Sequence, residues 1–299
     1  MLSALRYDRL PTERRNPRSH DLDRLSIPQL LRLMNQEDAT VPAAIRRVIP
    51  DIAKAVSFIV TALRAGGRLW FLGAGTSGRL GILEAAECPP TFHTPASLVQ
   101  GVIAGGRAAV FRSQEGAEDD RRCATQIVRQ RLRRHDVVVG IAASGVTPFV
   151  EQALKMAKTR GARTILVSCN PSTSIPATVR IRLAVGPEVL TGSTRLKAGT
   201  ATKLVLNMLT LGAMVQLGKT YGNLMVDVRP TSRKLRARAL SMIQSLASCD
   251  LRTAARCLEA AHGQTKVAVL MAKCHVSTHV AKRRLARVNG SLRRALRMT

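Results

Sequence analysis

The sequence is poor in aromatic residues, which occupy 3% of its 299 positions, whereas hydrophobic residues as a whole occupy 45%. Any core must therefore be packed from aliphatic side chains. A chain of this length and apolar content can bury a sizeable core, and it can form one large domain with a smaller one. Short β-branched runs mixed with Gly and Ala favour α/β layering over a β-sandwich.

Acidic residues are also scarce: 19 Asp and Glu stand against 47 Lys and Arg, and the formal net charge is +28. Such a balance is typical of proteins that bind nucleic acids. The basic residues, however, are spread along the chain, are not interleaved with aromatics, and fit no RNA-recognition or zinc-finger pattern. We therefore expect no specific nucleic-acid recognition, only weak, salt-sensitive binding to polyanions. The basic clusters lie at residues 6–24, 121–134, 229–238 and 282–297.

The six cysteines include no C-x-x-C pair, which is typical of reduced, mostly buried thiols in a cytosol. Residues 1–17 lack the apolar centre of a secretory signal, and the apolar run at 55–63 is far too short to span a bilayer. Histidines are scattered, and no cluster has metal-ligand spacing. We expect a cytoplasmic protein that has no membrane association and binds no metal.

Five short apolar runs, each followed by a loop rich in Gly, Ser, Asn or Pro, have the length of buried strands. Helical stretches separate most of them. This alternation predicts an α/β fold with a five-stranded parallel sheet flanked by helices. Ligands of such sheets bind outside the carboxyl ends of the strands, where these loops lie. The predicted strands are 68–72, 98–104, 136–142, 164–168 and 181–185.

The other segments are predicted to be helical or irregular. Residues 1–54 are expected to form an arm followed by helices, with a break at Pro50. Residues 55–220 contain all the strands and end in a long apolar helix at 196–218. Residues 231–299 show several short amphipathic patterns and no strand pattern, so we expect a small all-helical C-terminal domain.

The loop after the first strand contains Gly73, Gly75 and Gly78, which match the G-x-G-x-x-G pattern of dinucleotide-binding folds. That fingerprint also requires an acidic residue about 20 positions further on, which binds the ribose. Residues 88–114 contain no Asp or Glu. The dinucleotide interpretation is therefore disfavoured, and no such cofactor is expected.

Hydroxyl side chains in two loops favour a phosphate site. Thr76 and Ser77 stand at the start of the helix after the first strand, where free backbone N–H groups attract anions. Ser144 and Thr147 follow the third strand, with Thr147 as a helix cap and Pro148 as the first helical residue. Ordinary capping would explain either loop alone. Together the two loops predict a binding site in which neutral donors bind the phosphate group of a ligand. A phosphate bound in this way is expected to be held and not transferred in the reaction.

These two loops resemble the phosphate loops of the sugar isomerase (SIS) domain. Longer blocks resemble the N-acetylmuramic acid 6-phosphate etherase family over nearly the whole chain. The resemblance implies an SIS-type, flavodoxin-like sheet, a sugar-phosphate substrate and a homodimer. The blocks are 73–92 (GAGTSGRLGILEAAECPPTF), 116–120 (GAEDD), 140–148 (GIAASGVTP), 186–208 (GPEVLTGSTRLKAGTATKLVLNM) and 222–228 (GNLMVDV).

The family's reaction cleaves the ether between C3 of the sugar and D-lactate, leaving N-acetylglucosamine 6-phosphate. The resemblance therefore implies a lyase that eliminates lactate and then adds water, with acid–base groups and without a metal or redox cofactor. Two alternatives remain open. A non-catalytic regulator, related to the glucokinase regulatory proteins, would bind a sugar phosphate without turnover, and an isomerase would interconvert ketose and aldose without releasing lactate.

The resemblance also indicates candidate site residues. Glu87 matches the family's proposed acid–base position, and Glu118 matches the position assigned to the water step. Glu188 precedes a Ser-Thr-Lys stretch, as a catalytic Glu does in related SIS isomerases. Four residues that follow it are expected to bind the phosphate or the lactate carboxylate: Ser193, Thr194, Arg195 and Lys197. Without the resemblance, each of these carboxylates would be interpreted as an ordinary helix-end charge.

The position of Glu87 raises a geometric difficulty. A helix from Ser77 to Glu87 is about 15 Å long at 1.5 Å per residue, and Pro89 and Pro90 are expected to end it. We therefore expect either a short or bent helix, or a Glu87 that acts on a site in a partner subunit. Val146 departs from the family loop, where a polar residue such as Arg is expected, and this departure should affect substrate binding and not the chemistry.

Overall fold

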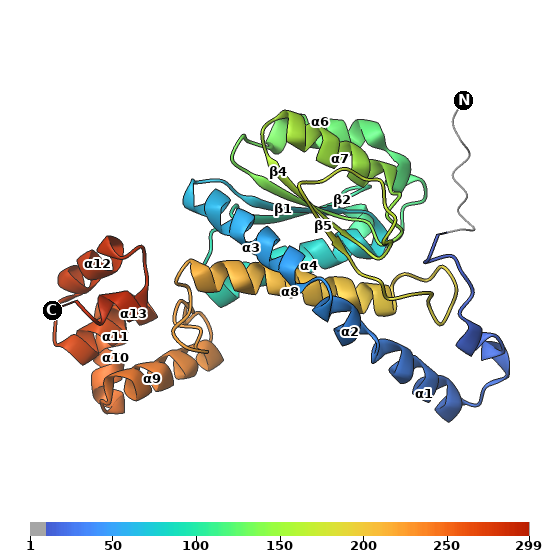
Figure 1. Cartoon of the computed structure of the whole chain (residues 1–299). Helices are drawn as coiled ribbons and strands as arrows, with labels where there is room; N and C mark the ends of the chain where they lie inside the picture. Colours follow the sequence, from blue (N-terminus) through green and yellow to red (C-terminus); the bar gives the residue numbers. More distant parts are fainter. Residues whose placement is uncertain (1–9, 299) are drawn as a thin grey trace. The chain divides into compact units, whose positions relative to one another are not determined.

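The five apolar runs form one parallel β-sheet in the computed structural model, which describes residues 10–298 (Figure 1). The strand order is β2-β1-β3-β4-β5, and every neighbouring pair is parallel. This confirms the predicted flavodoxin-like sheet, whose Val, Ile and Leu side chains are buried because helices cover both faces. The strands are β1 (Leu69–Gly73), β2 (Val99–Ile103), β3 (Val137–Ile141), β4 (Arg163–Ser168) and β5 (Val179–Arg182).

The order of the strands creates a crevice beside β1. Gly73, the last residue of β1, pairs with Ile103 of β2 and with Ile141 of β3, so the three strands end level. After β1 the chain crosses to β2 on one side, and after β3 it crosses to β4 on the other. Since the two connections diverge, the loops after β1 and β3 leave space between them, which is where such sheets bind ligands.

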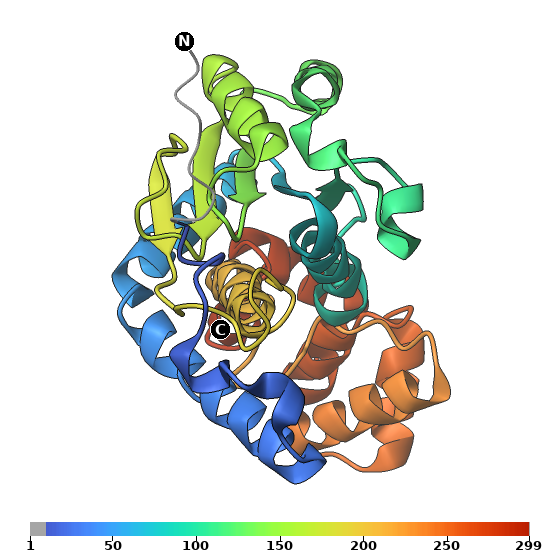
Figure 2. The same ribbon diagram turned by 90° about the vertical axis from the view of Figure 1, so that its right-hand side faces the viewer.

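Helices cover both faces of the sheet, as predicted (Figures 1 and 2). One face carries α6 (Arg121–Arg131) and α7 (Pro148–Thr159), and the other carries α3 (Ile49–Arg64) with the first parts of α4 (Gly75–Phe92) and α8 (Lys197–Gln216). The short helix α5 (Ala108–Phe111) follows β2. The core between the sheet and α7 is mainly aliphatic, and it includes the fully buried Trp70, Leu72, Val138, Phe149, Leu154 and Leu166.

The N-terminal region contains more helical structure than an extended arm. Two 3-10 turns, Pro17–Ser19 and Leu22–Arg24, precede α1 (Ile27–Asp38). Helix α2 (Val41–Arg46) is separated from α3, which has Pro50 in its first turn, so the predicted break near Pro50 is confirmed. Residues 1–9 of the expected arm lie outside the described residues.

The expectation that Pro89 and Pro90 end the helix after Glu87 is wrong, because α4 continues to Phe92 with both prolines inside it. Each proline removes the backbone hydrogen bond that its N–H would donate to the carbonyl four residues earlier, and both losses fall in the final turn of α4. The backbone N–H of His93 still donates to the carbonyl of Pro89 at 2.9 Å. The helix ends there because His93 adopts a left-handed conformation, with φ of 51°.

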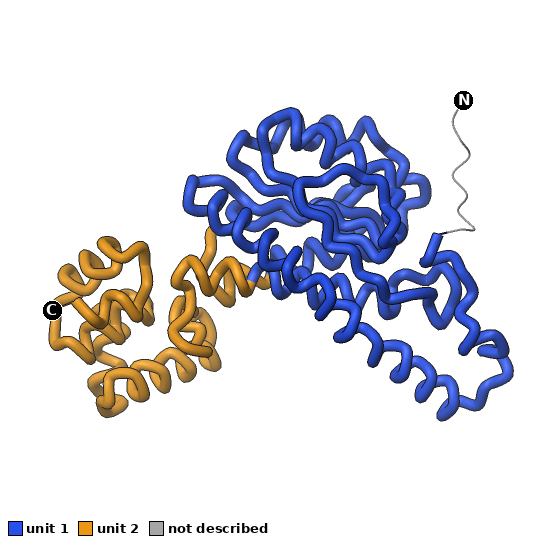
Figure 3. The backbone as a smooth tube through the Cα atoms, viewed as in Figure 1, with its two compact units in different colours: residues 1–86, 97–210 blue, residues 87–96, 211–299 orange. Residues whose placement is uncertain are grey.

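The described residues belong to two compact units, one of residues 1–86 and 97–210 and one of residues 87–96 and 211–299 (Figure 3). The second unit has its own aliphatic core, and its C-terminal part is all-helical, as predicted. The expected domain boundaries remain a prediction. The helices of this part are α9 (Arg233–Ala247), α10 (Leu251–Ala260), α11 (Thr265–Cys274), α12 (Thr278–Arg287) and α13 (Leu292–Ala295).

Among the described residues, only α8 is long and apolar enough to cross a membrane by length and composition. Four of its apolar residues in the first unit, Ala201, Val205, Leu206 and Leu209, have no exposed surface, whereas Met208 is 39% exposed. Such burial is expected of a helix in the core of a protein. A core helix can be as long and as apolar as a helix that crosses a membrane.

A buried carboxylate ties the starts of β1 and β3 together. Asp136 is 1% exposed and accepts hydrogen bonds from the backbone N–H and the guanidinium of Arg68, at 2.9 and 2.8 Å. It also accepts from the indole N–H of Trp70 at 3.0 Å and from the backbone N–H of Arg133 at 3.0 Å. Burial alone would raise the pKa of Asp136, but these hydrogen bonds outweigh it and lower the pKa.

Replacing Asp136 by Ala should reduce the free energy of unfolding by about 3–5 kcal/mol at neutral pH, because the Arg68 charge and several N–H groups lose their acceptor. Since the pKa of Asp136 is lowered in the folded state, its contribution is complete above the unfolded value of about 3.9 and is lost as the pH falls through the folded value. Urea unfolding of the two proteins at neutral and acid pH measures this. A difference in stability that does not shrink in acid would contradict it.

Candidate active site

A cavity of about 370 Å³ lies at the carboxyl ends of β1 and β3, within the first unit. This volume is in the range of small-molecule sites. The walls come from the loop after β1, the loop after β3, a 3-10 helix η4 (Ala117–Asp119) and the loop that precedes α8. The lining residues are Leu10, Glu13, Ala74, Gly75, Thr76, Ser77, Glu118, Asp119, Ala143, Ser144, Val146, Thr147, Pro148, Gly192 and Thr194.

The first loop is shaped by a close approach between strand and helix. A Cβ atom on Gly73 would lie 2.7 Å from the backbone nitrogen of Gly78, and one on Gly78 would lie 2.6 Å from Ile103. Only glycine at both positions lets α4 start directly after β1. As a result, Thr76 and Ser77 lie in the first turn of an 18-residue helix, where free N–H groups and the helix dipole attract an anion.

The second loop depends on Gly145, which has φ of 72°. A side chain there would also lie within 2.9 Å of Ser168, Asn170 and Thr173. Thr147 is the N-cap residue of α7, as predicted, with Pro148 in the first turn. Its hydroxyl makes no capping hydrogen bond, however, so this group is available to a ligand in the cavity.

The second loop is held in place by two residues that the sequence analysis did not single out. The side-chain amide of Asn170 donates to the carbonyl of Ser144 at 2.9 Å, and the hydroxyl of Thr173 donates to the carbonyl of Gly145 at 2.7 Å. Both are buried, at 3% and 5% exposure. The C-N-P sequence after the fourth strand was the available signal, but only the fold brings it beside the loop after β3.

Glu118 lines the cavity from η4 and also borders a smaller adjoining cavity of about 180 Å³. Its side chain still reaches solvent. Partial burial of the carboxyl group, followed by repulsion from Asp119 and Glu115, raises the pKa of Glu118 above its ordinary value. A carboxyl group with a raised pKa is suited to proton transfer near neutral pH.

The cavity offers neutral donors. Among its described lining residues there is no Lys or Arg, and Thr76, Ser77, Ser144 and Thr147 line it. The binding of a phosphate by these neutral groups remains a prediction. Val146 lines the cavity and adds no charge. Of the four residues named after Glu188, Thr194 lines the cavity, and Ser193, Arg195 and Lys197 do not.

Glu188 and Lys197 lie outside this cavity and stabilise the start of α8. The Glu188 carboxylate accepts hydrogen bonds from the backbone N–H groups of Lys197 and Ala198, at 3.2 and 2.9 Å. Burial raises the pKa of Glu188, and these N–H groups oppose that shift. The ammonium group of Lys197 donates to Glu37 at 2.6 Å, and Glu37 also pairs with Arg18 at 3.0 Å.

Glu87 belongs to the second unit and is not among the residues that line the cavity. One turn earlier on α4, the sequence analysis missed Glu84, which is buried. Its carboxylate accepts hydrogen bonds from Asn207 and Thr210 of α8, within the first unit. The structure therefore brings Glu118 together with the two hydroxyl-rich loops within the first unit.

Comparison with known proteins agrees with this architecture. Residues 124–212 match the SIS domain, and residues 51–158 match the glucokinase regulatory protein N-terminal SIS domain. A Bacteroides fragilis structure described as a phosphosugar isomerase involved in capsule formation has the same fold, with a TM-score of 0.51 at 19% identity over 64% of this chain and 91% of that one. The fold and the cavity thus define an SIS-domain protein.

The sequence places the chain more narrowly. It is 53% identical to N-acetylmuramic acid 6-phosphate etherase of Gloeothece citriformis, over 96% of this chain and 95% of that protein. It is 49% identical to the etherase of Brucella anthropi, over 99% and 97% of the two chains. The chain belongs to the N-acetylmuramic acid 6-phosphate etherase family, which confirms the resemblance.

Replacing Asn170 by Ala should weaken sugar-phosphate binding about tenfold, because the carbonyl of Ser144 loses its buried donor and the second loop loosens. Calorimetric titration with N-acetylglucosamine 6-phosphate measures the dissociation constant. The control is Ser172→Ala, which keeps the backbone N–H that donates to Asn170 at 2.9 Å and should bind normally. Equal affinity in the Asn170 variant and the native protein would exclude this role.

Proposed function

We propose that this protein is an N-acetylmuramic acid 6-phosphate etherase, a carbon–oxygen lyase. It cleaves the C3 lactyl ether to give N-acetylglucosamine 6-phosphate and D-lactate. The observation that carries the proposal is the single cavity in which two hydroxyl-rich loops meet Glu118, whose pKa is raised. Relatives that carry this name and match nearly the whole chain support it.

The phosphate of the substrate is bound by the two loops. Thr76 and Ser77 contribute hydroxyls and the N–H groups of the first turn of α4, and Ser144 and Thr147 contribute hydroxyls beside α7. Neutral donors at helix ends bind an anion without neutralising it through a strong ion pair. This suits a phosphate that anchors the sugar and takes no part in bond cleavage.

The chemistry requires proton transfers at the sugar. Opening of the ring exposes the C1 aldehyde, which makes the C2 proton acidic. A base removes that proton, and the lactate oxygen leaves C3 with the bonding electrons and takes up a proton from an acid, which gives free lactate and a C2–C3 double bond. Water then adds at C3 and a proton returns to C2, so the route is balanced without a metal or a redox cofactor. We assign the acid–base roles to Glu118 and Glu87.

Glu87 is assigned to a site formed in a homodimer. Glu118 lines the cavity of the first unit, whereas Glu87 lies in the second unit of the same chain. A homodimer would allow Glu87 of one subunit to act on the substrate of the other. We further propose that the enzyme is cytoplasmic, where a phosphorylated amino sugar would be available. The regulator and isomerase alternatives are not favoured, because the relatives named as etherases match nearly the whole chain.

Lactate release from N-acetylmuramic acid 6-phosphate tests the function directly. Glu118→Gln and Glu87→Gln should fold normally and lose about 10²–10⁴-fold in turnover, because each loses a group that exchanges protons with the substrate. Glu115→Gln, on the same loop as Glu118, is the control and should keep most of its activity. Saturable binding of the substrate without lactate release by the native protein would favour the regulator.

Mixing the two inactive variants tests whether Glu87 acts across subunits. If it does, a heterodimer of Glu87→Gln and Glu118→Gln contains one site with both native carboxylates. Random pairing should then restore about one quarter of native turnover. No recovery after confirmed subunit exchange would place both residues in one subunit.

The pH dependence of turnover should report Glu118. As the base that activates water, it must be deprotonated, and its pKa is raised above the ordinary value of about 4.3. The ratio kcat/KM should therefore fall as the pH drops through this raised value. Asp119→Asn removes a negative neighbour, so the acid limb should move to lower pH. An acid limb that stays at the same pH, or that moves to higher pH, would exclude Glu118 as the group whose titration produces it.

A further inference from the structure

Unbalanced positive charge gathers on the last two helices of the second unit, α12 and α13 (red in Figure 1). These helices pack against each other. The chain contains no Asp or Glu after Glu259 and no aromatic residue between 261 and 299. The exposed cations of this cationic face are Lys282, Arg283, Arg287, Arg293, Arg294 and Arg297.

The carboxylates nearest in sequence are already engaged away from this face. Residues 211–299 include three acidic side chains. Asp227 accepts from the ammonium groups of Lys219 and Lys266, at 3.2 and 2.8 Å. Asp250 caps α10, and Glu259 pairs with Arg236 of α9 at 3.0 Å. None of these three carboxylates pairs with a cation of the cationic face.

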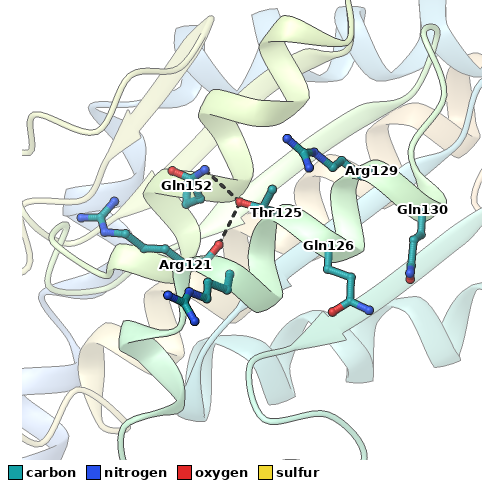
Figure 4. Close-up of a pocket in the computed structure, with 7 residues that line it drawn as sticks. Arg121, Thr125, Gln126, Arg129, Gln130 and Gln152 are labelled. Carbon is teal, nitrogen blue, oxygen red and sulfur yellow. Dashed lines mark hydrogen bonds between the residues drawn. The ribbon is translucent and has the colours of Figure 1, made fainter.

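A second basic surface provides a useful contrast. A groove of about 580 Å³ on α6 is lined by three arginines and several glutamines (Figure 4). There, however, Arg121 pairs with Glu151 at 2.8 Å, and Asp120 caps the same helix. Acidic residues 115–120 adjoin it in sequence. The α6 groove thus has partial neutralisation that the cationic face lacks.

The chemistry of the cationic face restricts what it can bind. The large apolar side chains of the cationic face are not exposed. The exposed large apolar side chains of the second unit are Leu211, Val215 and Leu251, which lie on other helices. Without exposed apolar groups the face cannot insert into a bilayer. The aromatic residue that contacts this face is Tyr221, and one side of its ring is already covered by the guanidinium of Arg293, 4.7 Å from the ring centroid, which disfavours stacking on unpaired bases. Six long cationic side chains remain, which match a regular row of closely spaced phosphates.

We propose that the α12–α13 face binds the phosphate backbone of duplex DNA without reading the bases. Side chains one helical turn apart, such as Arg283 and Arg287, lie about 5–6 Å apart at their Cβ atoms, and B-form DNA carries one charge per about 1.7 Å of its axis. Ionic contacts of this kind release counterions and carry no sequence preference. The inference does not rest on the etherase function.

Fluorescence anisotropy of a labelled duplex of 20 base pairs, titrated with the full-length protein at several KCl concentrations, tests the proposal. The variant Lys282→Gln, Arg283→Gln, Arg287→Gln should bind about tenfold or more weakly, and the slope of log Kobs against log[KCl] should become shallower by about 2–3. A second triple variant, Arg122→Gln, Arg129→Gln, Arg131→Gln on α6, removes the same charge and should bind within about twofold of the native protein.

Both variants should release lactate at the native rate, which separates this test from that of the etherase function. Equal weakening by the two triple variants would show that net charge alone governs binding and would overturn the proposal. So would a dissociation constant that changes when the base sequence is permuted. Vesicles containing phosphatidylserine that bind more tightly than DNA would assign the face to a membrane surface instead.

Discussion

The close approach of α4 to β1 is the constraint on which the candidate site depends. Gly73 and Gly78 leave no room for a Cβ atom, because each would overlap backbone or Ile103. The helix therefore begins at once, and its free N–H groups face the crevice that the divergence of β1 and β3 opens. A pattern that formally matches dinucleotide-binding loops here serves the close packing of α4 against β1.

The electrostatics of the site differ from those of the whole chain. The protein has a formal net charge of +28, yet the described lining of the cavity contains no Lys or Arg and includes three carboxylates, Glu13, Glu118 and Asp119. Partial burial of its carboxyl group, followed by repulsion from Asp119 and Glu115, raises the pKa of Glu118. The excess of positive charge lies elsewhere, with a cationic face at the C-terminal end of the second unit.

Buried hydrogen bonds and one ion pair engage two of the residues that the sequence analysis had assigned to ligand binding and that do not line the cavity, Glu188 and Lys197. A carboxylate or ammonium group removed from water must be paired and hydrogen-bonded. Glu188 meets this need at the free N–H groups of α8, and Lys197 meets it at Glu37, 160 positions away in the chain. Glu188 and Lys197 thereby position α8 and the N-terminal region beside the site. The contact of these two residues with the substrate remains a prediction.

The sequence by itself determined the strands, most helix starts and the two hydroxyl-rich loops, because apolar period, Gly, Pro and capping residues act over a few neighbouring positions. It also determined the family, through blocks that extend over nearly the whole chain. Only the tertiary structure decided that Asn170 and Thr173 hold the second loop, that Glu84 binds α8, and that α4 passes through Pro89 and Pro90. These outcomes depend on which distant segments the strand order brings together, and local patterns carry no information about that order.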